Sequence, residues 1–228
     1  MTLYPIFVAV APRYLTKTEL ALQALRDRIR SGELKPGQRL RVEELTREFG
    51  MSPTPIREAL RLLQADRLVD YRAHQGIVVS ELSPDVTEEV YRLRALLEPL
   101  AMELAVPRLT DEQLEELEHL HEQHAAAVAS GRGASISERN WAWHWAMYDN
   151  SGSPLLNDFI RRLWDGFPWR TMWALPGRIE LSMREHNAIM DAVRDRDAAL
   201  AARRVREHVQ SSQKTLLARL RRELTPGE

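Results

Sequence analysis

The chain has 228 residues, of which 44% are hydrophobic and 29% charged, a composition typical of a folded protein with room for one or two domains. It contains no cysteine, which excludes disulfide bonds and thiolate metal ligands. No apolar run approaches the roughly 20 residues of a membrane-spanning helix, and the N-terminal run lacks the features of a signal peptide, so we expect a cytoplasmic protein without membrane contact.

The formal net charge of −1 conceals an uneven distribution. Residues 1–80 carry 13 Lys and Arg against 9 Asp and Glu, whereas residues 81–228 carry 19 against 24. A basic front part and an acidic back part suit a polyanion-binding domain that is attached to a domain with another role.

The front part has the pattern of three helices followed by a hairpin. Apolar residues at helical spacing, with turn residues at their ends, predict helices that begin near Thr18, Leu40 and Pro53. The β-branched stretches 68–71 and 76–79, joined by a four-residue turn, predict two short strands. Three helices and a basic hairpin together form a winged helix-turn-helix.

The turn between the second and third predicted helices carries the signals of a DNA-reading module. Gly50 suits the left-handed position that ends a helix, and Ser52 suits the cap of the next one. Pro53 then falls in the first helical turn, where a missing N–H costs nothing. Thr54 and Arg57 face outward near the start of this helix, which is the end that enters a major groove.

Beyond Ser83-Pro84 nothing has the pattern of a strand. Pro and Gly separate apolar segments at helical spacing, and these segments predict six helices, near 85–106, 110–130, 136–150, 153–174, 178–195 and 197–224. Short connections indicate an antiparallel α-helical bundle. We therefore predict a mainly α fold with two domains: a winged helix-turn-helix over 1–82, whose first 15 residues form an irregular arm, and an all-helical domain over 83–228.

Three histidines occur in apolar-patterned helices of the second domain. Asn140 and His144 are four residues apart on one predicted helix face, and His186 and His208 lie on the last two helices. Any one of them alone is more often a satisfied core or surface residue than a metal ligand. Three histidines in one bundle interior are costly unless something pairs with them, and a divalent cation would satisfy all three.

These residues lead to a family. Gly32-Glu33-Leu34-Lys35-Pro36-Gly37, followed by the stretch from Ser52 to Leu60, closely resembles the N-terminal domain of GntR-type bacterial transcription regulators. The helical second part resembles the ligand-sensing FCD domain of the FadR subfamily. The two resemblances together span about residues 15–222.

The resemblance implies which residues contact DNA. Ser52, Thr54 and Arg57 match the family's Ser-Arg-Thr-Pro-x-Arg pattern, in which the recognition helix contacts bases and phosphates. Pro53 stands where an arginine is usual, which removes a donor that could bind guanine bidentately. The other residues that the resemblance offers for DNA contact precede the second helix or lie at the wing tip: Arg39, Arg41, His74, Gln75 and Gly76.

The resemblance also implies a metal site and an effector site. The set Asn140, His144, His186 and His208 is similar to the site of metal-binding FCD domains, in which aspartate is the more frequent first ligand. Zinc is the first choice, with nickel and manganese open. Arg94 matches the arginine that helps to hold a carboxylate effector in such domains, and a surface salt bridge between Arg94 and Glu98 is the alternative interpretation.

A second group of histidines, His119, His121 and His124, stands among glutamates. We interpret it as a solvated helix face.

The leading hypothesis is a homodimeric transcription regulator that binds two half-sites of a double-stranded DNA operator under the control of a small carboxylate at the metal. The alternatives are a metal-dependent hydrolase or lyase that uses the three histidines, and a regulator that responds to metal alone. We expect no enzyme, because no HExxH helix is present and helical spacing points Glu185, the one candidate general base, away from the histidines.

Overall fold

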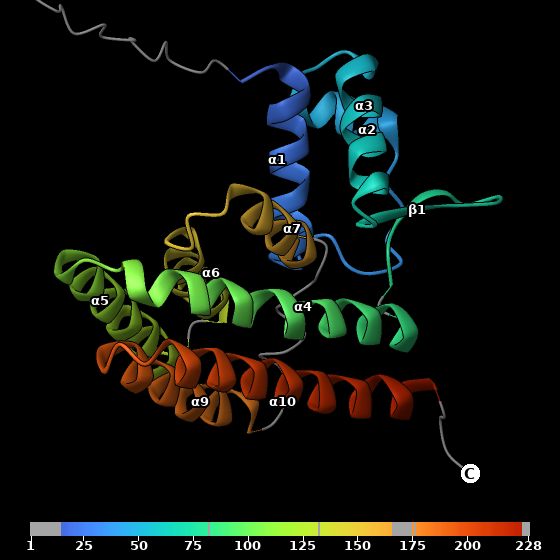
Figure 1. Cartoon of the computed structure of the whole chain (residues 1–228). Helices are drawn as coiled ribbons and strands as arrows, with labels where there is room; N and C mark the ends of the chain where they lie inside the picture. Colours follow the sequence, from blue (N-terminus) through green and yellow to red (C-terminus); the bar gives the residue numbers. More distant parts are fainter. Residues whose placement is uncertain (1–14, 82, 132, 166–174, 176, 225–228) are drawn as a thin grey trace, which may run out of the picture.

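The structure is a computed structural model that describes residues 15–81, 83–131, 133–165, 175 and 177–224 (Figure 1). The described chain is mainly helical, with one two-stranded sheet. None of the described helices is long and apolar enough to cross a membrane.

The N-terminal part, which we call the head, is a winged helix-turn-helix. It contains α1 (Lys17–Arg30), α2 (Val42–Phe49), α3 (Pro53–Ala65), β1 (Val69–Arg72) and β2 (Gly76–Val79). The antiparallel register pairs Val69 with Val79 and Arg72 with Gly76. The three helices and the strands bury one apolar core, in which Leu25, Ile56 and Leu63 are fully enclosed. The predicted helices and strands of this part are confirmed to within a few residues.

The turn between α2 and α3 follows the chemistry of its residues. Gly50 has φ +61°, the left-handed conformation that most residues avoid, and its N–H donates to the Thr46 carbonyl. Ser52 is the N-cap residue of α3 and Pro53 occupies the first helical position. Ser52 therefore occupies the expected N-cap position, but its side chain makes no capping hydrogen bond within the described chain.

The C-terminal part, which we call the body, is a helical bundle. Its elements are α4 (Pro84–Ala105), the short 3-10 helix η1 (Val106–Arg108), α5 (Asp111–Ala129), α6 (Gly133–Asp149), α7 (Pro154–Asp165), α9 (Arg178–Arg194) and α10 (Ala198–Leu224). The side chain of Ser83 caps α4, and Thr110 and Gln113 form a capping box at the start of α5. The predicted helix over 153–174 is confirmed as far as Asp165, and 166–174 lie outside the described residues.

The long helices α4 and α10 lie side by side, with α9 beside α10 and α5 packed on α6 and α9 (Figure 1). The bundle has its own core, separate from that of the head, and this core includes Trp143, Tyr148 and Trp164. Trp169 and Trp173 lie outside the described residues.

Head and body meet where α7 and the start of α4 approach α1 and the end of α3. Arg26 of α1 lies 3.8 Å from Asp165 of α7 and 2.5 Å from Asp66, the C-cap residue of α3. A pocket between the two parts is lined by apolar residues of both, among them Leu34 and Leu93. Arg26 thus connects α7 of the body to the end of α3.

Candidate metal centre and DNA-binding surface

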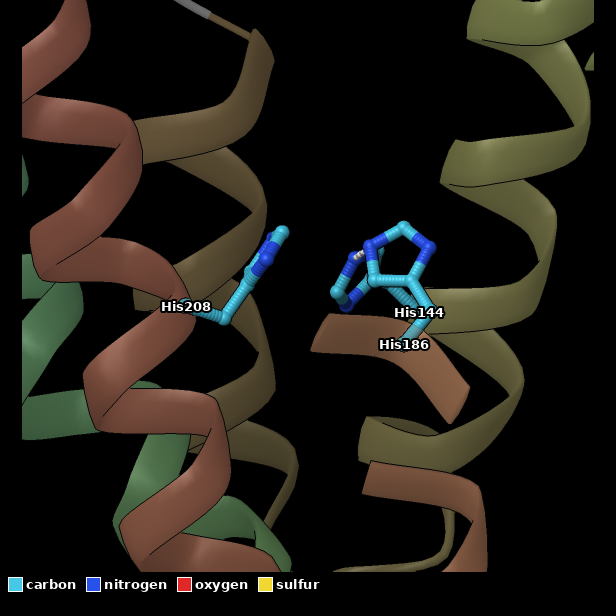
Figure 2. A group of neighbouring side chains, drawn as sticks. All are labelled: His144, His186 and His208. Carbon is cyan, nitrogen blue, oxygen red and sulfur yellow. Dashed lines mark hydrogen bonds between the residues drawn. The ribbon is translucent and has the colours of Figure 1, made fainter. Parts of the chain in front are cut away.

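Three helices of the body bring His144, His186 and His208 together (Figure 2). One ring nitrogen from each lies within 4.8 Å of the others, and all three side chains are buried. His144 comes from α6, His186 from α9 and His208 from α10, so only the folded bundle assembles the cluster. The sequence prediction that these three histidines share one interior is met by this geometry.

Asn140 lies one helical turn before His144 on α6. Its side chain is 5% exposed, and its Oδ1 has no hydrogen-bond partner within the described part of the chain. A buried amide oxygen without a partner is costly, and a cation is one of the groups that would satisfy it.

A hydrogen-bond chain fixes the orientation of the His144 ring. Its Nδ1 lies 3.1 Å from the Tyr148 hydroxyl, which donates to Glu98 Oε2 over 2.8 Å. Since the Tyr148 hydrogen is used on Glu98, the network assigns the hydrogen of His144 to Nδ1. The Nε2 lone pair of His144 then faces His186, whose Nε2 is 3.3 Å away.

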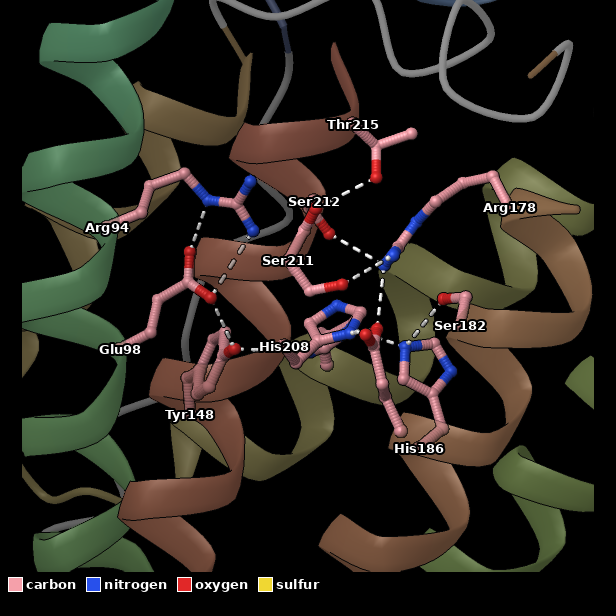
Figure 3. A network of polar contacts seen from close by, with 12 residues as sticks. Arg94, Glu98, Tyr148, Arg178, Ser182, His186, His208, Ser211, Ser212 and Thr215 are labelled. Carbon is pink, nitrogen blue, oxygen red and sulfur yellow. Dashed lines mark hydrogen bonds and ion pairs between the residues drawn. The ribbon is translucent and has the colours of Figure 1, made fainter. Parts of the chain in front are cut away.

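His208 is oriented in the same way by Glu185. The Nδ1–H of His208 donates to Glu185 Oε2 over 2.7 Å, and Arg178 donates to the same oxygen over 2.8 Å (Figure 3). A carboxylate behind a histidine is the arrangement that holds metal-binding imidazoles in the required tautomer. The expectation that Glu185 points away from the histidines was wrong, because His208 lies on the neighbouring helix α10, where the Glu185 side chain reaches it.

The third ring, His186, is held less firmly. Its Nε2 is 3.3 Å from both His144 Nε2 and the Ser182 hydroxyl, and its Nδ1 has no hydrogen-bond partner among the described residues. Two Nε2 atoms at this distance need either a proton or a cation between them, because two lone pairs repel. Three neutral imidazole nitrogens this close together fit a divalent cation.

Burial sets the protonation states at this centre. Desolvation lowers the pKa of His144 and of His186 well below the ordinary value, and it lowers the pKa of His208 despite the opposing effect of Glu185. Burial raises the pKa of the Tyr148 hydroxyl well above its ordinary value. The histidines are therefore neutral at pH 7, which is the form that binds metals.

The second group of histidines is not the solvated face that we expected. His119 is exposed, but His121 is 8% exposed and His124 is fully buried. His121 Nε2 lies 2.8 Å from Asn187 Oδ1 on α9, and the His124 ring centroid is 5.3 Å from that of His186. The glutamates indicated an exposed helix, yet His121 and His124 lie on the stripe of α5 that packs on α6 and α9.

Arg94 and Glu98 form a buried ion pair. Arg94 Nε donates to Glu98 Oε1 over 2.5 Å, and the two side chains are 2% and 0% exposed. Glu98 also accepts from Trp164 Nε1 over 2.8 Å and from Tyr148. The alternative interpretation of Arg94 named the right partner but the wrong environment, because the pair lies in the core and not on the surface.

Sequence reasoning did not name Tyr148 and Arg178 as part of this centre. Tyr148 follows His144 by four residues on the same helix face, and this spacing was a signal that could have found it. Arg178 is 2% exposed and donates to Ser211 over 3.1 Å and to Ser212 over 2.7 Å as well as to Glu185. No local pattern around Arg178 indicates that it turns inward.

The residues expected to contact DNA lie on the surface of the head. Thr54 and Arg57 are exposed at the start of α3, next to the exposed Ser52. Arg39 is exposed and pairs with Val78 of the wing, and its guanidinium lies beside Gly76. Arg41 lies at the start of α2 and bonds Glu44 over 3.0 Å. His74 and Gln75 lie at the tip of the wing. Tyr71 on β1 is 71% exposed on the same part of the molecule, and the sequence prediction did not name it.

A winged helix-turn-helix joined to a helical body defines a DNA-binding transcription regulator. Comparison with family models matches residues 17–79 to bacterial regulatory proteins of the gntR family and residues 89–211 to the FCD domain. The chain belongs to the GntR family of transcription regulators and carries an FCD domain, as in the FadR subfamily.

Individual relatives agree with this assignment. The uncharacterized HTH-type transcriptional regulator YdhC of Bacillus subtilis (strain 168) is 30% identical over 187 residues, which cover 81% of this chain and 84% of the relative. The HTH-type transcriptional repressor GlaR of Escherichia coli (strain K12) is 29% identical over 197 residues, or 81% and 89% of the two chains. The solved structure of E. coli McbR/YncC has a TM-score of 0.78 at 27% identity, covering 93% of this chain and all of that one. The chain is a regulator and not an enzyme.

Proposed function

We propose that this regulator binds a pseudo-palindromic operator as a homodimer, and that a small carboxylate effector at a divalent metal controls its operator affinity. The ligands would be Asn140, His144, His186 and His208, with zinc preferred over nickel or manganese. The observation that carries the proposal is the convergence of three buried histidine nitrogens within 4.8 Å. Asn140, one helical turn before His144, adds a buried Oδ1 that has no partner among the described residues. The DNA-binding and effector-binding domains would span 1–82 and 83–228.

The chemistry of the donors supports this choice. Three imidazoles and an amide would leave the full charge on the cation, and a cation held there would attract a carboxylate oxygen as a Lewis acid. Glu185 and Tyr148 hold two of the imidazoles in the metal-binding tautomer. Arg94 lies among these groups as a buried cation, in keeping with a role in holding an anionic effector.

A continuous set of contacts connects the centre to the head. Tyr148 links His144 to Glu98, and Glu98 accepts from Trp164 on α7. The next residue, Asp165, lies 3.8 Å from Arg26, which bonds Asp66 at the end of α3. An effector that binds near His144 or Arg94 would change the hydrogen bonds that Glu98 accepts. Because one of these bonds comes from Trp164, the position of α7 would change with them. Coupling requires that the effector bind the two positions of α7 with different affinity.

On the DNA side, Thr54 and Arg57 would read bases at the start of α3, and Ser52 would contact a phosphate. The wing and the segment before α2 would grip the flanking backbone through Arg39, Arg41, His74 and the close-approach position Gly76. Repression is the expected outcome of binding, because GlaR and the galactonate operon regulator of E. coli (strain K12) are named repressors.

The first test is the metal content of the full chain after gentle purification, measured by mass spectrometry of the elements. About one equivalent of metal per chain is expected. The variant His186→Ala should lose this metal, whereas the matched surface variant His119→Ala should retain it. Less than about one equivalent per two chains would count against the site.

A gel shift with the protein's own upstream region against random DNA, at physiological salt, tests operator binding.

Calorimetry with a panel of carboxylates separates this proposal from regulation by metal alone. Binding to the metal-loaded protein and not to the chelated protein is expected if the effector is a carboxylate. Heat signals equal to buffer dilution for every carboxylate, together with metal-dependent operator binding, would favour the metal-only regulator.

A further inference from the structure

We propose that the effector of this regulator is a dianion, such as a dicarboxylate, rather than a monocarboxylate. The inference rests on the proposed metal site and concerns the charge that the effector must bring to it. It follows from the charges that the folded chain buries around the three histidines.

The buried charges of the body already cancel without a metal. Among the described residues, the buried side chains with a formal charge are Arg94, Glu98 and Arg178. Glu185, which is 17% exposed, pairs with Arg178 over 2.8 Å, as Glu98 pairs with Arg94. Two guanidiniums and two carboxylates therefore sum to zero, and each cation faces its own anion.

No ligand in the proposed set would neutralise the metal. The three histidines bind a cation as neutral imidazoles, and Asn140 offers an uncharged amide oxygen where an aspartate would bring one negative charge. A divalent cation would thus add two uncompensated positive charges to a buried site. Such charges are costly away from water unless they are paired, so the missing charge has to come from the effector.

The surroundings of the histidines suit an anion with two acidic ends. Figure 3 shows Arg94 of α4 and Arg178 of α9 reaching toward α10 from opposite sides, with Ser212 between them. His208 and His186 lie beside these groups in the same view. One carboxylate would meet the metal while the other approaches a guanidinium, a group that binds carboxylates through two parallel N–H donors.

Asn140 is therefore the residue that sets the charge of the effector. Replacing it by the isosteric aspartate would leave one positive charge to compensate, so the need for a second negative charge on the effector should disappear. This change leaves the histidines and both arginine pairs as they are.

The experiment compares dicarboxylates with their own monomethyl esters, which have nearly the same shape and one charge less. Calorimetry uses malonate, succinate, glutarate and malate at pH 7.5 on the metal-loaded full chain, with metal content measured on each sample. For the wild type, at least one diacid should bind roughly tenfold or more tightly than its monoester. In Asn140→Asp this ratio should fall by roughly tenfold, whereas Gln210→Glu, which adds the same charge on the exposed face of α10, should keep it.

The outcomes separate the two proposals. Protein that binds no metal overturns both. Metal-loaded wild-type protein that binds monoesters as tightly as diacids, or binds none of these diacids, overturns the dianion inference and leaves the metal site standing. An unchanged diacid preference in metal-loaded Asn140→Asp also overturns it, because the charge at position 140 would then have no part in the selection.

Discussion

Trp164 and Glu98, which are 66 positions apart in the sequence, are joined by a hydrogen bond of 2.8 Å from the indole Nε1 to the carboxylate. Glu98 is fully buried and accepts from Arg94, Tyr148 and Trp164, so it is a junction between the histidine cluster and α7. The neighbouring Asp165 faces Arg26 of the head. This bond links the histidine centre to α7, which faces the head through Asp165.

The variant Trp164→Phe removes this donor while keeping an aromatic ring in the core. We expect unchanged metal content and a reduction of roughly threefold or more in the effect of the effector on operator affinity, because α7 no longer follows Glu98. The free energy of unfolding should fall by about 1–3 kcal/mol, since a bond to a buried charge is lost. Fluorescence anisotropy with labelled operator, with and without effector, measures the coupling.

Trp145→Phe is the matched control for this change. Trp145 stacks on Trp141 with centroids 5.7 Å apart and does not contact Glu98 through any described hydrogen bond. It should keep the coupling of the wild type. Equal coupling in both variants and the wild type would rule out Glu98 and Trp164 as the connection.

Acid should destabilise the metal-free protein because its buried histidines cannot take up protons without cost. Burial lowers the pKa of His124 to about 4 from the ordinary 6.5. Between these values the unfolded chain binds more protons than the folded chain, so the free energy of unfolding falls as the pH drops below 6.5. His124 alone should contribute a loss of about 2 kcal/mol at pH 5 relative to pH 8. Urea unfolding across this range, with chelator present, measures it.

The variant His124→Gln should flatten this pH dependence by about one proton, whatever its effect on stability at pH 8. His119→Gln, which changes an exposed histidine on the same helix, should leave the slope as it is. The same slope for His124→Gln and the wild type would show that His124 titrates normally in the folded chain.

The fold could be predicted from the sequence because its signals are local. Gly50 and Pro53 fix the turn between α2 and α3, and Ser83 and Thr110 cap their helices through bonds that span only a few residues. These residues act on their neighbours in the chain, so their effect does not depend on the tertiary structure.

The surroundings of the histidines could not be predicted, because they depend on which helices are neighbours. The spacing of Asn140 and His144 is a local signal, but Glu185 reaches His208 only because α9 packs on α10. In the same way, His121 and His124 are buried by α6 and α9, which the glutamates around them do not reveal. Helical periodicity gives the faces of a helix but not its partners.

Arg67 is a position where substitution should stabilise the protein. It has φ +59°, a conformation that favours glycine, just after the C-cap of α3. Its ion pair with Glu89 is 3.6 Å long and 63–70% exposed, so it contributes little. Arg67→Gly should therefore raise the free energy of unfolding by roughly 0.5–1 kcal/mol in chemical denaturation.

Arg196 provides the contrasting case. Its φ is +52°, but its guanidinium donates to the Leu109 carbonyl and, over 2.6 Å, to Asp111. Arg196→Gly should lose these bonds, so its free energy of unfolding should stay the same or fall. A loss of stability in Arg67→Gly equal to that in Arg196→Gly would mean that the exposed pair with Glu89 outweighs the backbone strain.

The recognition helix offers the most direct test of how this regulator reads DNA. Arg57 is exposed in the first turns of α3, and Arg57→Ala should weaken specific operator binding by about 1–3 kcal/mol, that is, roughly 5- to 150-fold. Arg61→Ala, one turn further along α3 and exposed, is the matched control, because its guanidinium bonds Glu58.

Pro53→Arg restores the donor that is usual in the family, and it should raise affinity for sites with guanine at the corresponding position without raising affinity for random DNA. Selection of binding sites from a random library with the wild type and Pro53→Arg measures this shift. Identical selected sequences would show that position 53 does not face a base, and that the operator preference is set by Thr54, Arg57 and the wing alone.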